Sequence, residues 1–411
     1  MLWMGIDTHL KTHEVEIQNE NGKRMWAGRI DNDRSGFESL LKKVATVENS
    51  NNQKVMGIFM NPMGNYHMPV RHFLEANSLP VYVTDARRTE HLRIIQNLGK
   101  EKSDPVDASV LASTARLDPS AMDSKGHDPL PESGLTRLLE KLKRSATVIT
   151  NMIGSDLAAV FPEYTGIFEI GSKTSLRILE KYATPENMRD AGQGELFALM
   201  NTGKGHYKIH DARNLMEAAK TSIGIPDPGQ VYAYRIRMNA GRLREEKERI
   251  KQVESEIDGR MSGNMDVKNI SDIHGISITS AAAIVSEIGD IKQFDSAVRI
   301  QAYGGKAPDM KGSGGKSFSS GSSKIRNPHL SNSVYECAVS LVLHKNPEFL
   351  AIYQREIDKK KKPTQAYIVV GKRFLYHIYS IMKNEKPYRE RIPLESCSRA
   401  LASRGNTEPS P

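Results

Sequence analysis

The chain opens with WMGID at residues 3–7, an apolar run that ends in the carboxylate of Asp7. Much later, the segment KSDPVDA at residues 102–108 carries two more carboxylates, Asp104 and Asp107. Between them, IFMNPMGNY at residues 58–66 has the amide Asn61 where a further acid would complete a metal site. Clustered carboxylates are the ligands that hard divalent cations such as Mg²⁺ prefer. We therefore expect Asp7, Asp104 and Asp107 to converge in the fold, beside Asn61.

Residues 3 to about 118 alternate between strand and helix patterns. The expected strands are Trp3–Asp7, Glu14–Gln18, Arg24–Ile30, Val55–Met60 and Val81–Thr84, and the expected helices run through Phe37–Val44 and His67–Ala76. An antiparallel start that passes into strand–helix–strand units implies an α/β fold with a mixed sheet and helices on its faces. Reactive groups in such sheets gather at the carboxyl ends of strands, and Asp7 and Asn61 both lie there.

The rest of the chain is expected to be mostly α-helical. Ile236, Leu243, Ile250 and Ile257 recur every seven residues, which predicts a long helix packed on another element along one apolar seam. Glycine and serine crowd the stretch 304–323, and further helices follow it. The polar tail after Tyr388 is expected to be disordered. The predicted parts are 1–120, 128–262, 266–388 and 389–411.

The composition is that of an ordinary globular chain with more basic than acidic residues. The 411 residues carry a formal net charge of +9, which favours a polyanionic partner. The first residues lack the basic and apolar regions of a secretory signal, and no apolar run is long enough to span a bilayer. Cys337 and Cys397 have no disulfide or metal-site spacing. We expect a cytoplasmic protein that associates with the nucleoid and not with membranes.

The acid pair of the segment 102–108 allows two interpretations. Asp104 and Asp107 are three residues apart, so a helix would place both carboxylates on one face, as a metal site requires. Alternatively, Ser103 or Asp104 caps the helix and Asp107 complements its positive end. The combination with Asp7 and Asn61 favours the metal site.

Three motifs together resemble the amino-terminal RuvC-like domain of the DEDD transposases. They are Gly5–Asp7, Asn61–Tyr66 and Lys102–Ala108, in that order. This insertion-sequence family, IS110, includes the Piv DNA invertases and the bridge-RNA-guided recombinases. The carboxyl region is similar to the family's second domain at Ile273–Ile276, Ala281, Glu287–Asp290, Phe294, Ala302–Pro308, Ser313-Gly314, Asn346–Glu348, Tyr353 and Ala366.

The resemblance implies an RNase H-like nuclease domain over 1–120 and a transposase domain with a serine loop over 266–388. By position, Asp7, Asp104 and Asp107 would bind Mg²⁺ or Mn²⁺, and Ser313 would attack DNA. Such a transposase or site-specific recombinase would cut and rejoin DNA, as a homodimer or homotetramer. A structured guide RNA is a further partner that the resemblance allows.

Asn61 departs from the family pattern, because the family's second acid aligns with it. An amide offers a metal one neutral oxygen but no negative charge. Three explanations remain open: a working enzyme with a weaker metal site, rescue by a neighbouring acid such as Glu101, or a decayed or repurposed copy. The corresponding functional alternatives are a nucleic-acid-binding relative without full catalysis and a RuvC-like nuclease without a covalent step.

Ser313 and the basic residues also have plainer interpretations. The segment 311–316 around Ser313 is rich in glycine and could be a flexible linker. Basic side chains that could neutralise DNA phosphates follow the fifth strand and flank the serine, unless they form an ordinary solvated surface. The candidates are Arg87, Arg88, Arg93, Lys311, Lys316, Lys324 and Arg326.

Overall fold

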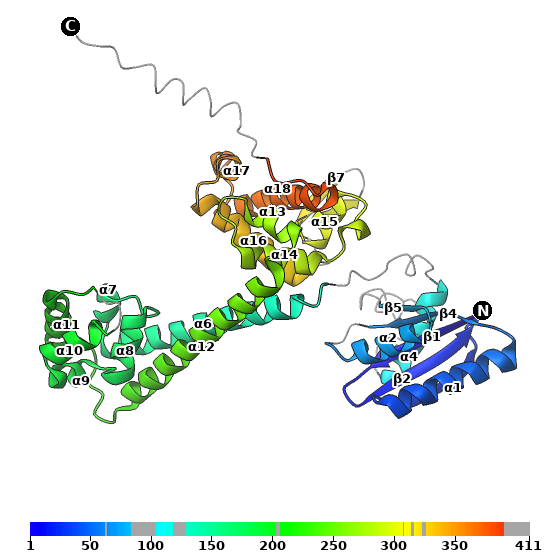
Figure 1. Ribbon diagram of the computed structural model, residues 1–411, viewed down its shortest axis with the longest axis horizontal. Coiled ribbons are helices and arrows are strands. Elements are labelled where there is room, and N and C mark those ends of the chain that lie inside the picture. Colours follow the sequence, from blue (N-terminus) through cyan, green and yellow to red (C-terminus); the bar gives the residue numbers. More distant parts are fainter. Residues whose placement is uncertain are drawn as a thin grey trace, which may run out of the picture. The chain divides into compact units, whose positions relative to one another are not determined.

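The computed structural model describes residues 1–61, 64–83, 103–117, 129–202, 206–306, 308–313, 316–322 and 326–389, with the main chain alone at 115, 308–313 and 316–322. The chain divides into two compact units, Met1–Asp128 and Pro129–Pro411 (Figure 1). The expected tail, 389–411, lies outside the described residues from position 390 onward. The four-part division expected from the sequence stays a prediction.

The first unit contains a mixed five-stranded sheet in the order β3-β2-β1-β4-β5. Its strands are β1 (Leu2–Thr8), β2 (Thr12–Asn19), β3 (Arg24–Asp31), β4 (Val55–Met60) and β5 (Val81–Val83). The strands β1, β2 and β3 are antiparallel neighbours, whereas β4 runs parallel to both β1 and β5. The predicted α/β class, with an RNase H-like mixed sheet, is therefore confirmed.

Helices cover both faces of this sheet. On one face, α1 (Arg34–Asn51) and α2 (His67–Ala76) contribute to a core with Leu2, Met4 and Ile6 of β1. On the other face, α4 (Asp104–Leu117) packs Leu111 against Trp3 and Phe59. Because strand side chains alternate between faces, Asp7 lies on the same face as Trp3, toward α4.

Gly5 allows α4 to cross β1 at very short range. A Cβ atom at Gly5 would lie 2.1 Å from the carbonyl oxygen of Ala108 and 2.4 Å from the nitrogen of Ala112. A side chain of any size would therefore push the helix away. The close crossing sets the start of α4, with its two aspartates, near the end of β1.

The second unit is almost entirely helical. Two long helices, α6 (Ser133–Val160) and α12 (Val231–Met261), lie side by side (Figure 1). The predicted long helix is confirmed as α12, in which Ile236, Leu243 and Ile257 are completely buried and Ile250 is partly buried. Shorter helices pack at one end of this pair: α7 (Tyr164–Ile167), α8 (Lys173–Lys181), α9 (Pro185–Ala191), α10 (Gln193–Met200) and α11 (Ile209–Thr221).

A separate hydrophobic core forms around the carboxyl-terminal helices. They are α13 (Met265–Ser271), α14 (Ile278–Ile288), the 3₁₀ turn η1 (Ile291–Gln293), α15 (Ala297–Tyr303), α16 (Pro328–Leu343), α17 (Pro347–Asp358) and α18 (Pro363–Asn384). The glycine- and serine-rich stretch contains an antiparallel hairpin, β6 (Pro308–Ser313) and β7 (Lys316–Ser322). It therefore holds two paired strands where the sequence also allowed a linker. No helix in the described ranges is long and apolar enough to cross a membrane.

Candidate metal centre and serine hairpin

Asp7 and Asn61 lie next to each other at the ends of two parallel strands. Ile6 of β1 is in register with Met60 of β4, so the residues that follow are neighbours. The hydroxyl of Thr8 donates a hydrogen bond to the carbonyl oxygen of Asn61 at 3.4 Å. Asp7 is buried, with 5% of its surface exposed. This is the edge of the sheet where parallel strands place reactive groups.

Asp104 joins Asp7 because α4 begins beside the end of β1. Asp7, His9 and Asp104 each offer a ligand atom, and these atoms all lie within 4.8 Å of one another. The Nε2 atom of His9 is 3.0 Å from Oδ2 of Asp7 and 3.4 Å from Oδ2 of Asp104. Asp104 and His9 are partly open to solvent, so a small ion could reach the group.

Asp107 lies one turn further along α4. Its main-chain N–H donates to the carbonyl oxygen of Ser103 at 3.0 Å, as in the first turn of a helix. Its side chain is half-buried, and it is not among the ligand atoms grouped within 4.8 Å. The described part of the chain thus brings two of the three predicted acids into one ligand group, and Asp107 flanks it.

Asn61 presents a buried oxygen at the same edge of the sheet. Its Oδ1 atom is shielded from solvent and accepts no hydrogen bond from the described residues. A buried amide oxygen of this kind normally has a partner, and a bound cation would supply one. Two carboxylates, an imidazole and an amide carbonyl form a donor set that fits a divalent metal ion.

His9 is the site residue that the sequence analysis missed. It lies two positions beyond Asp7, so the strand alternation that orients Asp7 could have pointed to it. The main-chain N–H of His9 donates to Nδ1 of His13 at 3.2 Å, which fixes the turn after β1. Carboxylates only accept hydrogen bonds, so Nε2 must carry a proton when it bonds to them, and it must lose that proton to bind a metal.

A buried polar layer on β2 supports α4 from the same side. Glu16 accepts a hydrogen bond from the Ser109 hydroxyl at 2.9 Å, and the Ser113 hydroxyl donates to Oε1 of Gln18 at 3.1 Å. Glu14 lies directly opposite Asp7 and pairs with Arg29 of β3. A hydrogen bond to Glu14 and the charge of Glu14 raise the pKa of Arg29, and the charge of Asp104 adds to the effect. The bonds from Ser109 and Ser113 hold α4, which carries Asp104 and Asp107, against β2.

Ser313 is the last residue of β6. It pairs with Lys316 across a two-residue connection, and Lys311 pairs with Phe318. The serine therefore sits at the tip of a hairpin in the second unit. Of the other predicted contacts, Arg326 is exposed just before α16. Four candidates lie outside the described residues: Arg87, Arg88, Arg93 and Lys324. Glu101, the alternative acid, lies outside them too.

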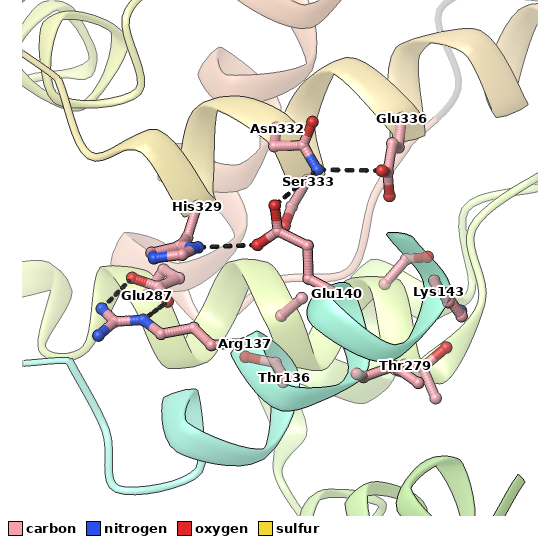
Figure 2. Close-up of a pocket in the computed structure, with 13 residues that line it drawn as sticks. Thr136, Arg137, Glu140, Lys143, Thr279, Glu287, His329, Asn332, Ser333 and Glu336 are labelled. Atoms are coloured by element: carbon pink, nitrogen blue, oxygen red, sulfur yellow. Dashed lines mark hydrogen bonds and ion pairs between the residues drawn. The ribbon is translucent and has the colours of Figure 1, made fainter. Parts of the chain in front are cut away.

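A polar pocket between α6, α14 and α16 is already occupied by its own side chains (Figure 2). Arg137 donates two hydrogen bonds to the buried Glu287, at 2.6 and 2.8 Å. On the other side, Glu140 lies 2.7 Å from Nδ1 of His329 and accepts from Asn332. The dashed contacts in Figure 2 link α6 to α14 and α16. The cluster holds three helices together, which is a structural role.

The sequence matches transposase family models in two places. Residues 4–162 match a transposase model of the DEDD class of IS110, and residues 267–354 match the transposase IS116/IS110/IS902 family. Together the two matches cover more than half of the chain. The first includes the whole Asp7–Asp104 site, and the second includes the serine hairpin.

Full-length relatives come from bacterial insertion elements. The uncharacterized 42 kDa protein of IS900 from Mycobacterium paratuberculosis is 22% identical, over 94% of this chain and 97% of its own length. The uncharacterized 43.6 kDa protein of IS110 from Streptomyces coelicolor is 20% identical, over 95% and 96%. The uncharacterized 44.8 kDa protein of IS116 from Streptomyces clavuligerus is 22% identical, over 96% and 97%. With both family models matched in order, the chain belongs to the IS110 family of insertion-element transposases.

Proposed function

We propose that this transposase cuts and rejoins DNA by combining a metal-binding carboxylate site with a serine nucleophile. One observation carries the proposal: Asp7 and Asp104, far apart in the sequence, place ligand atoms within 4.8 Å of each other and of His9. The buried Oδ1 of Asn61 at the same sheet edge supports it. The family matches supply the DNA substrate class.

Asp7, His9, Asp104 and Asn61 would hold the metal, and Asp107 lies one turn further along α4. A bound divalent ion, Mg²⁺ or Mn²⁺, would supply charge to stabilise the transferring phosphate. The chain's own contribution is rigidity. The close crossing at Gly5 and the β2 polar layer fix the positions of the two aspartates before any ion arrives. Such preorganisation saves the free energy of assembling the site during the reaction.

Ser313 would act as the nucleophile at the hairpin tip. Its Oγ would lose a proton to a general base and form a bond to phosphorus. The P–O bond to the leaving strand would break as that bond forms, and the leaving oxygen would take up a proton. The phosphoserine bond keeps the free energy of the broken link, so the reverse attack rejoins DNA without a nucleotide cofactor. A serine hydroxyl is weak at its free pKa and needs such activation.

Trapping a covalent protein–DNA adduct tests this proposal. The full chain is incubated with Mg²⁺ and DNA that carries the sequences flanking its gene, and the products are separated under denaturing conditions. We expect an adduct with wild type and with Ser317→Ala, which makes the same change on the other strand of the hairpin. We expect none with Ser313→Ala. An adduct that persists in Ser313→Ala would refute the serine assignment.

Asn61 favours a second candidate, a DNA-binding relative with weakened catalysis. An amide lacks the charge that a fourth carboxylate would contribute to metal binding. This candidate predicts salt-sensitive DNA binding without cleavage in either Mg²⁺ or Mn²⁺. The nuclease alternative predicts cleavage that survives Ser313→Ala and disappears in Asp104→Ala.

We also infer that the protein works as a dimer or tetramer, because two DNA strands must be held while they are exchanged. Light scattering of the purified chain, with and without DNA, measures the assembly. A monomer in both states would contradict the inference. RNA that copurifies and is protected from ribonuclease would support a guide-RNA partner. Loss of cleavage after removal of this RNA would show that cleavage requires it.

A further inference from the structure

A second, larger cavity opens in the second unit beside the serine hairpin. Its volume is about 510 Å³, within the range of small-molecule sites. Both ends of the hairpin segment contribute to its wall, because Lys306 precedes β6 and Arg326 follows β7. The N–H of Asn327 donates to the carbonyl oxygen of Tyr303 at 2.8 Å, which ties the two ends together.

Lys306 is a buried cation in the wall of this cavity. It is only 7% exposed, and Nζ donates to the carbonyl oxygen of Ser331 at 3.1 Å. The Nζ atom also lies 5.7 Å from the ring centre of Tyr335. Among the described residues, the charged group that acts on Lys306 is Arg326, and no carboxylate does so. Burial, with a further effect from the charge of Arg326, lowers the pKa of Lys306 to about 8.

The rest of the cavity wall adds positive charge. Lys141, Arg144 and Arg326 line it together with Lys306. The acid in the wall, Glu140, already contacts His329 at 2.7 Å and Arg144 at 3.0 Å. A buried ammonium beside a guanidinium costs free energy, because their charges repel and neither solvation nor an acid compensates Lys306. An anion in the cavity would remove that cost.

Arg326 is held toward the cavity by Gly305. A Cβ atom on Gly305 would lie only 2.3 Å from Cδ of Arg326, so the arginine stem lies directly on the glycine. Gly305 also has a φ of +66°, a backbone conformation that residues with a side chain rarely adopt. The stem of Arg326 is thus positioned by its contact with Gly305, and the ammonium of Lys306 by its hydrogen bond to Ser331.

We propose that this cavity binds a phosphate of the DNA backbone, with Lys306 and Arg326 as its main ligands. The assignment rests on the proposed function, because that function brings DNA to the hairpin whose two ends form the wall. A phosphodiester suits a site with one ammonium and one guanidinium, which bind phosphate as a point charge and as a planar fork. The contact would position the DNA strand at the base of the hairpin and carry no sequence information.

The test measures DNA binding without metal, so that no chemistry can occur. The full chain is titrated in EDTA with a short fluorescein-labelled DNA duplex across a salt series. We expect Lys306→Met to weaken binding about tenfold and to reduce the slope of log K against log salt by about one. Lys268→Met, the same change at an exposed lysine of α13 outside the cavity, should leave the slope unchanged.

Further measurements distinguish the remaining explanations for a change in DNA binding. Equal slopes in wild type and Lys306→Met would overturn the proposal. Urea unfolding without DNA shows whether Lys306→Met is folded, and Arg326→Met should reduce the slope in the same way. Inorganic phosphate that stabilises wild type, with no effect of either variant on the DNA slope, would assign the cavity to free phosphate instead. Ser313→Ala should bind DNA with the wild-type salt slope. The phosphate contact of the cavity can therefore be tested even if the adduct experiment refutes the role of Ser313.

Discussion

The acids of the candidate metal site differ from two buried acids of the second unit in how their charge is balanced. In the second unit, Glu287 receives a two-point contact from Arg137, and Glu348 contacts Arg373, His377 and Tyr388. In the first unit, Asp7 and Asp104 converge on one shared imidazole, at 3.0 and 3.4 Å. An acid held by its own cation has a structural role, whereas two acids that converge beside an imidazole form a group that can bind a metal ion.

Removing Asp104 should produce the largest effect on function. We expect Asp104→Ala to reduce metal-dependent DNA cleavage by about 100-fold or more, since loss of even a supporting contact at a metal site costs 10- to 100-fold. Its free energy of unfolding should change by less than about 1 kcal/mol, because the lost interaction is that of an exposed acid at a helix start. Cleavage assays and urea unfolding measure the two quantities.

Asp31→Ala is the matched control, because it removes an exposed acid from the same sheet. It should leave cleavage unchanged. Strong destabilisation by Asp104→Ala, with normal cleavage in the folded fraction, would show that Asp104 has a structural role like that of Glu287 and Glu348.

Gly5→Ala should damage the first unit by displacing α4. The new Cβ would overlap the carbonyl oxygen of Ala108 at 2.1 Å, so the helix must shift. We expect a loss of about 3 kcal/mol in the free energy of unfolding, together with weaker metal binding. Gly134→Ala is the control, since a Cβ there meets nothing within 4 Å and lies in α6. That variant should be stabilised by up to about 1 kcal/mol. A fully stable Gly5→Ala with normal metal affinity would show that the crossing does not position the site.

A low pH should destabilise the second unit, because it protonates Glu348. Burial alone would raise the pKa of Glu348, but hydrogen bonds from His377, Tyr388 and Arg373 outweigh it and lower the pKa to about 2. In the unfolded chain the pKa of Glu348 is near its usual value of 4.5, so the unfolded chain binds this proton at a higher pH than the folded chain does. Stability is therefore fully present above pH 4.5 and is lost as the pH falls toward 2, by about 2 kcal/mol.

Glu348→Gln should remove this part of the pH dependence, measured by urea unfolding between pH 5 and pH 2.5. The same variant should bind metal and cut DNA normally at neutral pH if it remains folded. Unchanged acid sensitivity in Glu348→Gln would mean that other carboxylates control it.

Patterns in the sequence identified the sheet through its short apolar runs and the long helix through its seven-residue repeat. The run at residues 3–7 placed Asp7 at the end of a strand, and the repeat placed Ile236 and Leu243 in a seam. Two features escaped because they depend on contacts between distant segments. His9 becomes a site residue only when α4 brings Asp104 to it, and the hairpin around Ser313 pairs residues without a clear apolar alternation. Lys306 was missed for the same reason, since nothing local marks a lysine as buried.

Asn61→Glu should have a smaller effect that depends on metal. Without metal, an additional carboxylate near Asp7 and Asp104 should lower the melting temperature, because the added charge is repelled and partly buried. With Mg²⁺ the same variant should bind the ion about tenfold more tightly than wild type, measured by calorimetry, and should cut DNA faster. Asn61→Gln has the same length without the charge, so it separates charge from size. If both variants bind Mg²⁺ as wild type does, Asn61 lies outside the metal site, and the buried oxygen at the end of β4 must serve a purely structural purpose.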